Sequence, residues 1–83
     1  MPLANPTDHI LAADALTAPP SPLTPREAEV LAAAGADRPI REIARALFLS
    51  PGTVRNYLAA ITQKLGADGR ADAYRMARDN GWV

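Results

Sequence analysis

The stretch REIARALFLSPGTVRNYL, residues 41–58, decides the fold. Its first part carries apolar residues at the spacing of one helical face: Ile43, Ala44 and Leu47. Ser50 then offers a capping hydroxyl to a new helix, and Pro51 occupies the favoured first helical position. Two short helices joined by about four residues, the second freshly capped, are the pattern of a helix-turn-helix.

Start and stop signals on either side of this pair extend the prediction to four helices. Residues 24–27, Thr-Pro-Arg-Glu, form a capping box with Pro at the first helical position, and this helix should end at Gly35 or Asp37. The second helix should begin near Pro39, the third should span 51–65, and the fourth should span 70–80. The fold class predicted is therefore all-α.

Composition narrows the range of functions. The chain has 83 residues, which is enough for one small domain, and its lack of Cys and single His exclude a disulfide, a thiolate site and a His-rich metal cluster. We expect no metal and no cofactor. No run approaches the roughly 20 apolar residues of a membrane span, so the expected setting is cytoplasmic. No catalytic constellation is evident, so we do not expect an enzyme.

Proline divides the chain into a lead, 1–23, and a body, 24–83. In the lead we expect one short helix within 7–18, followed by a Pro-rich, extended connector. A frayed linker and a helix that docks on the body or on a second chain remain open for this segment. The lone His9 lies there as a solvent-exposed linker residue.

The outward side of the predicted helix 51–65 carries residues that are suited to contact DNA. Arg55 can donate a bidentate pair to guanine, Asn56 can do the same for adenine, and the small Ala59 allows close approach to base edges. The free N–H groups at the start of the helix suit a phosphate, and Ser50 and Thr53 add hydroxyl groups there. These features predict that the second helix of the pair enters the DNA major groove.

Charge distribution agrees with this prediction, although nine Lys and Arg balance nine Asp and Glu over the whole chain. Residues 38–70 hold six basic and two acidic residues, a local net charge of +4. Two alternatives stay open on patterning alone. A helical protein-interaction module would carry a solvated basic face, and a promoter-reading region of a sigma factor would use a similar hairpin.

Three stretches together are specific enough to indicate a family: LTPREAEVL (23–31), REIARALFLSPGTVRNYL (41–58) and ITQKLGADGRADA (61–73). The chain from Leu23 to about Ala77 resembles the four-helix LuxR-type helix-turn-helix, the effector domain of response regulators of the NarL/FixJ branch. The stretch LFLSPGTVRNYL looks most like the corresponding sequence of the lipid-desaturase regulators, the DesR-like branch. The resemblance implies sequence-specific binding of double-stranded DNA in transcription regulation under a two-component system.

The resemblance also implies roles for individual residues. Contacts to bases are implied for Gly52, Arg55, Asn56 and Ala59. Contacts to phosphates are implied for Ser50, Thr53, Tyr57, Lys64 and Arg70. A homodimer surface on helix 70–80 is implied for Ala71, Tyr74, Arg75 and Arg78. RNA polymerase is a further candidate partner, and no receiver domain fits within this length.

Some positions depart from the family pattern. Asp37 and Arg38 stand where the turn has Gly and an apolar residue, and Ala59 replaces a longer polar or basic residue in many relatives. Asp68 precedes Arg70 and would repel a nearby phosphate. Phe48, in the turn of the motif, and Trp82, near the end of the chain, are expected to close the core of a chain that is poor in aromatic residues.

Overall fold

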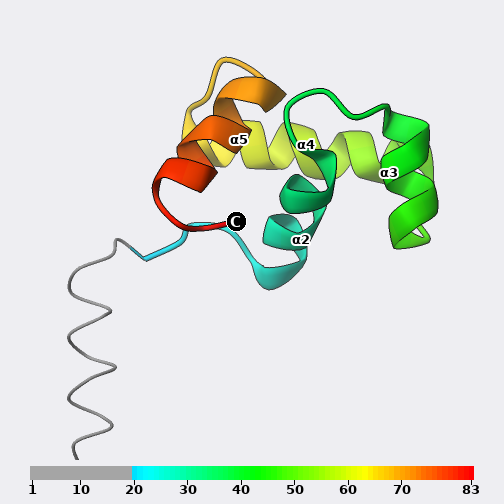
Figure 1. The fold of residues 1–83 in the computed structure, drawn as a ribbon, viewed down its shortest axis with the longest axis horizontal. Coiled ribbons are helices and arrows are strands. Elements are labelled where there is room, and N and C mark those ends of the chain that lie inside the picture. The colour runs from blue at the N-terminus through cyan, green and yellow to red at the C-terminus, as the bar shows by residue number, and fades with distance from the viewer. Residues whose placement is uncertain (1–19) are drawn as a thin grey trace, which may run out of the picture.

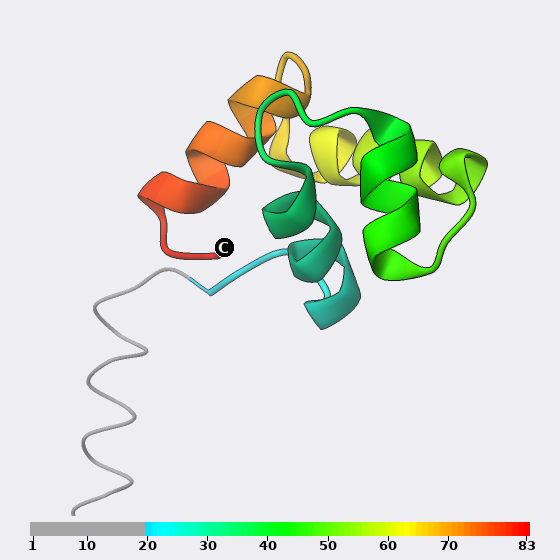
Figure 2. The ribbon, with the colours of Figure 1, turned by 45° about the vertical axis from the view of Figure 1, so that its right-hand side comes forward.

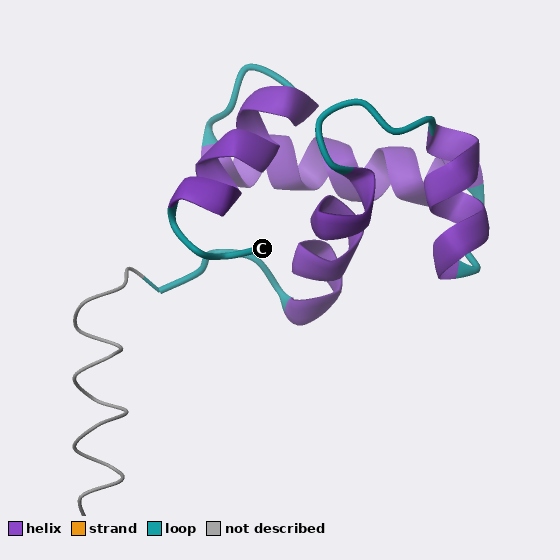
Figure 3. Cartoon of the chain, viewed as in Figure 1, coloured by secondary structure: helices purple, strands orange, loops and turns teal. Residues whose placement is uncertain are grey.

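The structure, a computed structural model, describes residues 20–83, and this part of the chain contains four helices. The helices are α2 (Pro25–Ala34), α3 (Ile40–Leu47), α4 (Pro51–Leu65) and α5 (Arg70–Asp79). No strand occurs within these residues, so the predicted all-α, four-helix fold is confirmed (Figure 3). The predicted helix within 7–18 and His9 lie outside the described residues.

Helix α4 is the longest element and the one on which the others pack. It makes contact with α2, α3 and α5, and α2 also packs on α3. Figures 1 and 2 show α3 near the start of α4, α5 near its end, and α2 between them. A single core joins the four helices: Leu23, Val30, Leu31, Ala34, Ile43, Ala44, Val54, Leu58, Ile61, Ala73 and Ala77. One side of α4 is not covered by the other helices and is exposed to solvent.

Helix ends follow the capping signals in the sequence. The Thr24 hydroxyl accepts the Glu27 N–H at 3.1 Å, and the Glu27 carboxylate accepts the Thr24 N–H at 2.8 Å, so the capping box is confirmed. Ser50 caps α4 by accepting the Thr53 N–H at 3.1 Å. Of the two residues proposed to end α2, Gly35 is the C-cap, with a φ of 56° that glycine adopts without steric cost.

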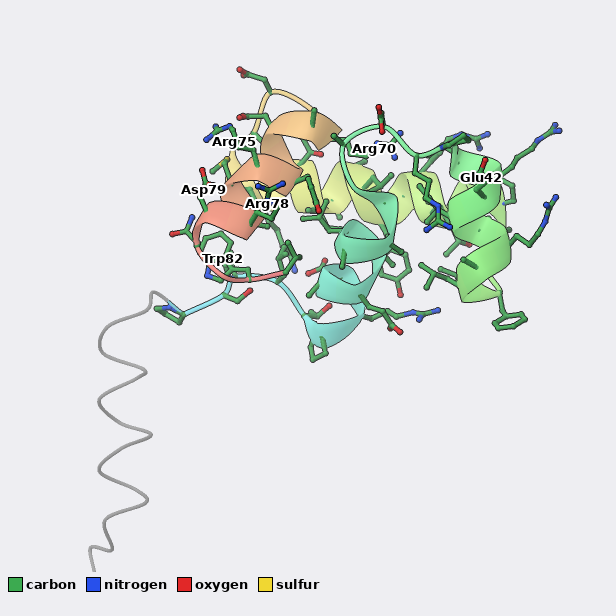
Figure 4. The ribbon with its side chains drawn as sticks, in the orientation of Figure 1. Glu42, Arg70, Arg75, Arg78, Asp79 and Trp82 are labelled. Atoms are coloured by element: carbon green, nitrogen blue, oxygen red, sulfur yellow. The ribbon has the colours of Figure 1, made fainter. Side chains whose placement is uncertain are left out.

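Arg70, the first residue of α5, links that helix to the end of α2. Its Nη1 donates to the backbone oxygen of Ala34 at 3.3 Å and to that of Arg38 at 2.7 Å. Carbonyls at a helix C-terminus lack intrahelical partners, and a guanidinium satisfies them well. The side chain therefore fixes the loop between α2 and α3 against α5, and Figure 4 shows Arg70 beside that loop.

Phe48 differs from the prediction. It is 95% exposed and does not close the core, because it ends α3 in the left-handed conformation with φ 58° and ψ 41°. The Leu49 N–H then donates to Ala44 O at 2.9 Å, and the Leu49 side chain packs against the core in its place. Trp82 does pack against the core, as predicted.

The Phe48→Gly variant is expected to be more stable than the wild-type protein by about 0.5–1 kcal/mol. Glycine removes the steric cost of the left-handed conformation, which is about 1–2 kcal/mol, and part of that gain is offset by the greater entropy of glycine in the unfolded chain. Thermal unfolding followed by circular dichroism measures the change. Phe48→Ala keeps the Cβ and should leave the midpoint nearly unchanged; an equal rise in both variants would contradict the argument.

Candidate nucleic-acid interface

The free side of α4 carries the residues predicted to read bases. Gly52, Arg55, Asn56 and Ala59 are all exposed, as is Gln63 one turn further on. The opposite side of the same helix is buried through Val54, Leu58 and Ile61. The predicted division of this helix into a core face and an outward face is therefore confirmed.

The start of α4 gathers polar groups at the same end as Arg55. The Ser50 hydroxyl donates to the Thr53 hydroxyl at 2.8 Å while it accepts the Thr53 N–H, so the two side chains hold each other in place. Within residues 20–83 the Gly52 N–H has no hydrogen-bond acceptor. A free N–H at the positive end of a helix, flanked by two hydroxyls, is suited to an anionic oxygen.

A shallow hollow of about 310 Å³ lies between α4 and the start of α2. It brings together three predicted site residues, Thr53, Asn56 and Tyr57, with Ala60 and Glu27 completing the lining. Tyr57 is half-buried and packs against the core, which places it at the edge of the outward face. Through Asn56, the hollow adjoins the predicted DNA-reading face.

Lys64, predicted to contact phosphate, has a partner within the protein. Its Nζ lies 2.7 Å from Glu27 Oε1, the same oxygen that accepts the Thr24 N–H. The Lys64 ammonium, followed by the Thr24 N–H, lowers the pKa of the Glu27 carboxyl below its ordinary value. Glu27 is only 7% exposed, and it is the one buried charged residue in the described part of the chain.

Most other cations are also engaged. Arg26 pairs with Glu29 at 2.8 Å, and Arg38 lies 3.6 Å from Glu42. Arg70 donates to the two backbone carbonyls described above. Pairing with a neighbouring acid or carbonyl limits how far each of these side chains can turn toward a ligand.

Three cations have no ion pair, hydrogen bond or ring contact with residues 20–83: Arg41, Arg45 and Arg55. All three are exposed on the helix-turn-helix. Arg41 and Arg45 were counted in the sequence only as part of the local charge. A signal for them was present, because the acid nearest to them on α3, Glu42, lies four residues after Arg38 and can pair with it.

The predicted dimer residues lie together on α5. Ala71, Arg75 and Arg78 are exposed and Tyr74 is half-buried. Arg75 bridges two acids of its own helix, Asp72 and Asp79, and the Arg78 guanidinium lies 5.8 Å from the centre of the Tyr74 ring. Figure 4 shows Arg75 and Asp79 on the side of α5 that faces away from the other helices, and Arg78 in front of the helix.

Comparison with known proteins assigns this helical domain to a family. Residues 21–77, which include α2, α3, α4 and most of α5, match the family described as bacterial regulatory proteins, luxR family. The chain belongs to the luxR family. Membership confirms the helix-turn-helix domain inferred from the sequence and its DNA-binding role in transcription regulation.

Among the relatives of this luxR-family chain, two carry the names of regulators and one carries that of a spore germination protein. Response regulator RamR of Streptomyces coelicolor is 47% identical over 76 residues, which cover 92% of this chain and 38% of RamR. Transcriptional regulatory protein DesR of Bacillus subtilis is 40% identical over 62 residues, or 75% of this chain and 31% of DesR. Spore germination protein GerE of the same organism is 47% identical over 51 residues, or 61% of this chain and 69% of GerE.

The chain thus spans about a third of the length of RamR and DesR. These matches bear out the predicted resemblance to response regulators. DesR is among the relatives, but its identity to this chain is lower than that of RamR, so the greatest likeness is not to DesR. Within residues 20–83, no helix has the length and apolar character needed to cross a membrane.

Proposed function

We propose that this luxR-family chain binds double-stranded DNA sequence-specifically, as the effector part of a response regulator in a two-component system, with α4 in the major groove. One observation carries the proposal. The outward face of α4 presents Arg55 and Asn56, whose side chains can form bidentate hydrogen bonds with guanine and adenine, next to a free Gly52 N–H. Small residues at Gly52 and Ala59 let the helix come close to the base edges.

Phosphate contacts would surround this base-reading face. Ser50 and Thr53 lie at the start of α4, and Tyr57 lines the hollow beside it. The first helix of a helix-turn-helix crosses the DNA backbone, so the unpaired Arg41 and Arg45 of α3 add positive charge where phosphates pass. Lys64 and Arg70, implied as phosphate contacts by the family resemblance, each have protein partners, and Lys64 is treated separately below.

Dimerisation through α5 would place two copies on an inverted or direct repeat about one helical turn apart. Ala71, Tyr74, Arg75 and Arg78 are the proposed contacts. In this proposal residues 1–23 link the domain 24–83 to a receiver or another control element, and RNA polymerase is the partner recruited in the cytoplasm. The chain acts as a binding domain and not as an enzyme.

The test of DNA binding is its salt dependence. With two unpaired cations per domain placed at phosphates, Arg41 and Arg45, the logarithm of the affinity should fall with the logarithm of salt concentration. The slope should be about −2 for one domain and about −4 for a dimer, from the release of about 0.9 counterion per phosphate contact. Fluorescence titration of labelled duplexes, enriched from a random library by the 83-residue chain, measures both affinity and slope.

A protein-interaction module is the other candidate function, and the balanced charge of the chain is the observation that favours it. That candidate predicts no enrichment of any duplex and no salt-dependent binding. Either result would exclude the proposed function, whereas enrichment of one sequence motif with a steep slope would exclude the interaction module.

A further inference from the structure

We propose that Lys64 is a positioning residue that acts on DNA binding through Glu27, by neutralising its carboxylate, and does not itself contact a phosphate. This inference rests on the proposed DNA-binding function. It concerns a pair that joins the start of α2 to the last turn of α4, across 37 positions of sequence. The family resemblance alone implies the opposite role for Lys64.

The geometry of the pair is the first argument. Lys64 Nζ lies 2.7 Å from Glu27 Oε1, which is the distance of a strong charge-assisted hydrogen bond. The same oxygen accepts the Thr24 N–H at 2.8 Å and so belongs to the cap of α2. If Lys64 turned toward a phosphate, Glu27 would keep a negative charge with its main counter-charge removed, at a site only 7% exposed.

The position of Glu27 is the second argument. It lines the hollow that also contains Thr53, Asn56 and Tyr57, the side of α4 where the DNA backbone would pass. A carboxylate without a partner in that hollow would repel the phosphates that these residues are proposed to meet. Neutralisation by Lys64 therefore removes a repulsion from the interface in addition to fixing α2 on α4.

The distribution of cations is the third argument. Arg41, Arg45 and Arg55 are exposed and unpaired among residues 20–83, whereas Lys64 and Arg70 each hold a group at an end of α2. Lys64 holds the carboxylate of the N-terminal cap, and Arg70 holds a C-terminal carbonyl. Lys64 and Arg70 thus stabilise α2, the helix that packs on α4. The unpaired arginines of the helix-turn-helix are the cations available to DNA.

A double-variant cycle tests the assignment. The wild-type chain, Lys64→Gln, Glu27→Gln and the variant carrying both changes are titrated with the enriched duplex at a temperature at which circular dichroism shows them folded. Gln is also favoured at the third helical position of a capping box, so Glu27→Gln keeps the cap while it removes the charge. Lys64→Arg is the matched variant that keeps the charge.

We expect Lys64→Gln to bind the duplex about tenfold more weakly, and we expect Glu27→Gln to restore affinity in the double variant to within about twofold of Glu27→Gln alone. Lys64→Arg should bind nearly as the wild-type chain does. A direct phosphate contact predicts that the double variant stays about as weak as Lys64→Gln. That result would overturn the assignment, and so would an unchanged affinity of folded Lys64→Gln.

The experiment still separates the two roles of Lys64 if a variant does not fold, and it still tests the pair if the chain binds no DNA. If Lys64→Gln does not fold, the comparison of the double variant with Glu27→Gln still separates the two roles, because neither of them contains an unpaired carboxylate. If the wild-type chain binds no duplex, the proposed function fails. The coupling of Lys64 to Glu27 then remains measurable as a non-additive change in thermal midpoint across the four proteins, and additive changes would exclude it.

Discussion

Arg55→Ala is expected to weaken binding to the enriched duplex by about 1–3 kcal/mol and to relax specificity at one base pair. The expected loss is large because Arg55 is exposed at the start of α4 and has no partner within residues 20–83, so its fork is available for the O6 and N7 atoms of guanine. Titration against the enriched duplex and against its single-base variants measures both effects.

Arg55→Lys is the matched control, because it keeps the charge and loses the planar fork. It should retain the salt slope of the wild-type chain while it loses discrimination at the same base pair. If Arg55→Ala bound specific and random duplexes as the wild-type chain does, α4 would not be the reading helix.

Ile61→Ala is expected to destabilise the domain by about 2–4 kcal/mol, because Ile61 is fully buried on the core face of α4 and its removal leaves a cavity. In a domain of this size each kcal/mol corresponds to roughly 4–8 °C, so the thermal midpoint should fall by about 10 °C or more. DNA binding should weaken only as far as the folded fraction falls.

Gln63→Ala provides the control from the same helix. Gln63 is exposed two residues further along, and its replacement should change the free energy of unfolding by no more than about 0.5 kcal/mol. Equal midpoints for Ile61→Ala and the wild-type chain would mean that α4 is not packed as described.

The helices were predictable because each begins or ends on a strong local signal. Pro25 and Pro51 stand at first helical positions after capping hydroxyls, and glycine follows α2 and α4. The outward face of α4 was equally accessible to sequence reasoning, since helical spacing alone separates Arg55 and Asn56 from Val54 and Leu58. Local patterns of this kind need no knowledge of tertiary contacts.

Two features were not predictable for physical reasons. The exposure of Phe48 depends on its backbone conformation, which directs Leu49 inward instead, and hydrophobicity alone favours burial of the larger residue. The pairing of Lys64 with Glu27 joins residues 37 positions apart and requires the packing of α4 on α2. Composition could count these charges, but only the folded chain shows which of them are already engaged.

The exposed turn at Phe48 has a practical use. It lies immediately before the helix proposed to enter DNA, and the chain contains no cysteine. A cysteine introduced in place of Phe48 would be the single thiol of the protein and would be open to a maleimide dye. Energy transfer between that dye and one on the duplex would then report the orientation in which the helix-turn-helix meets the DNA.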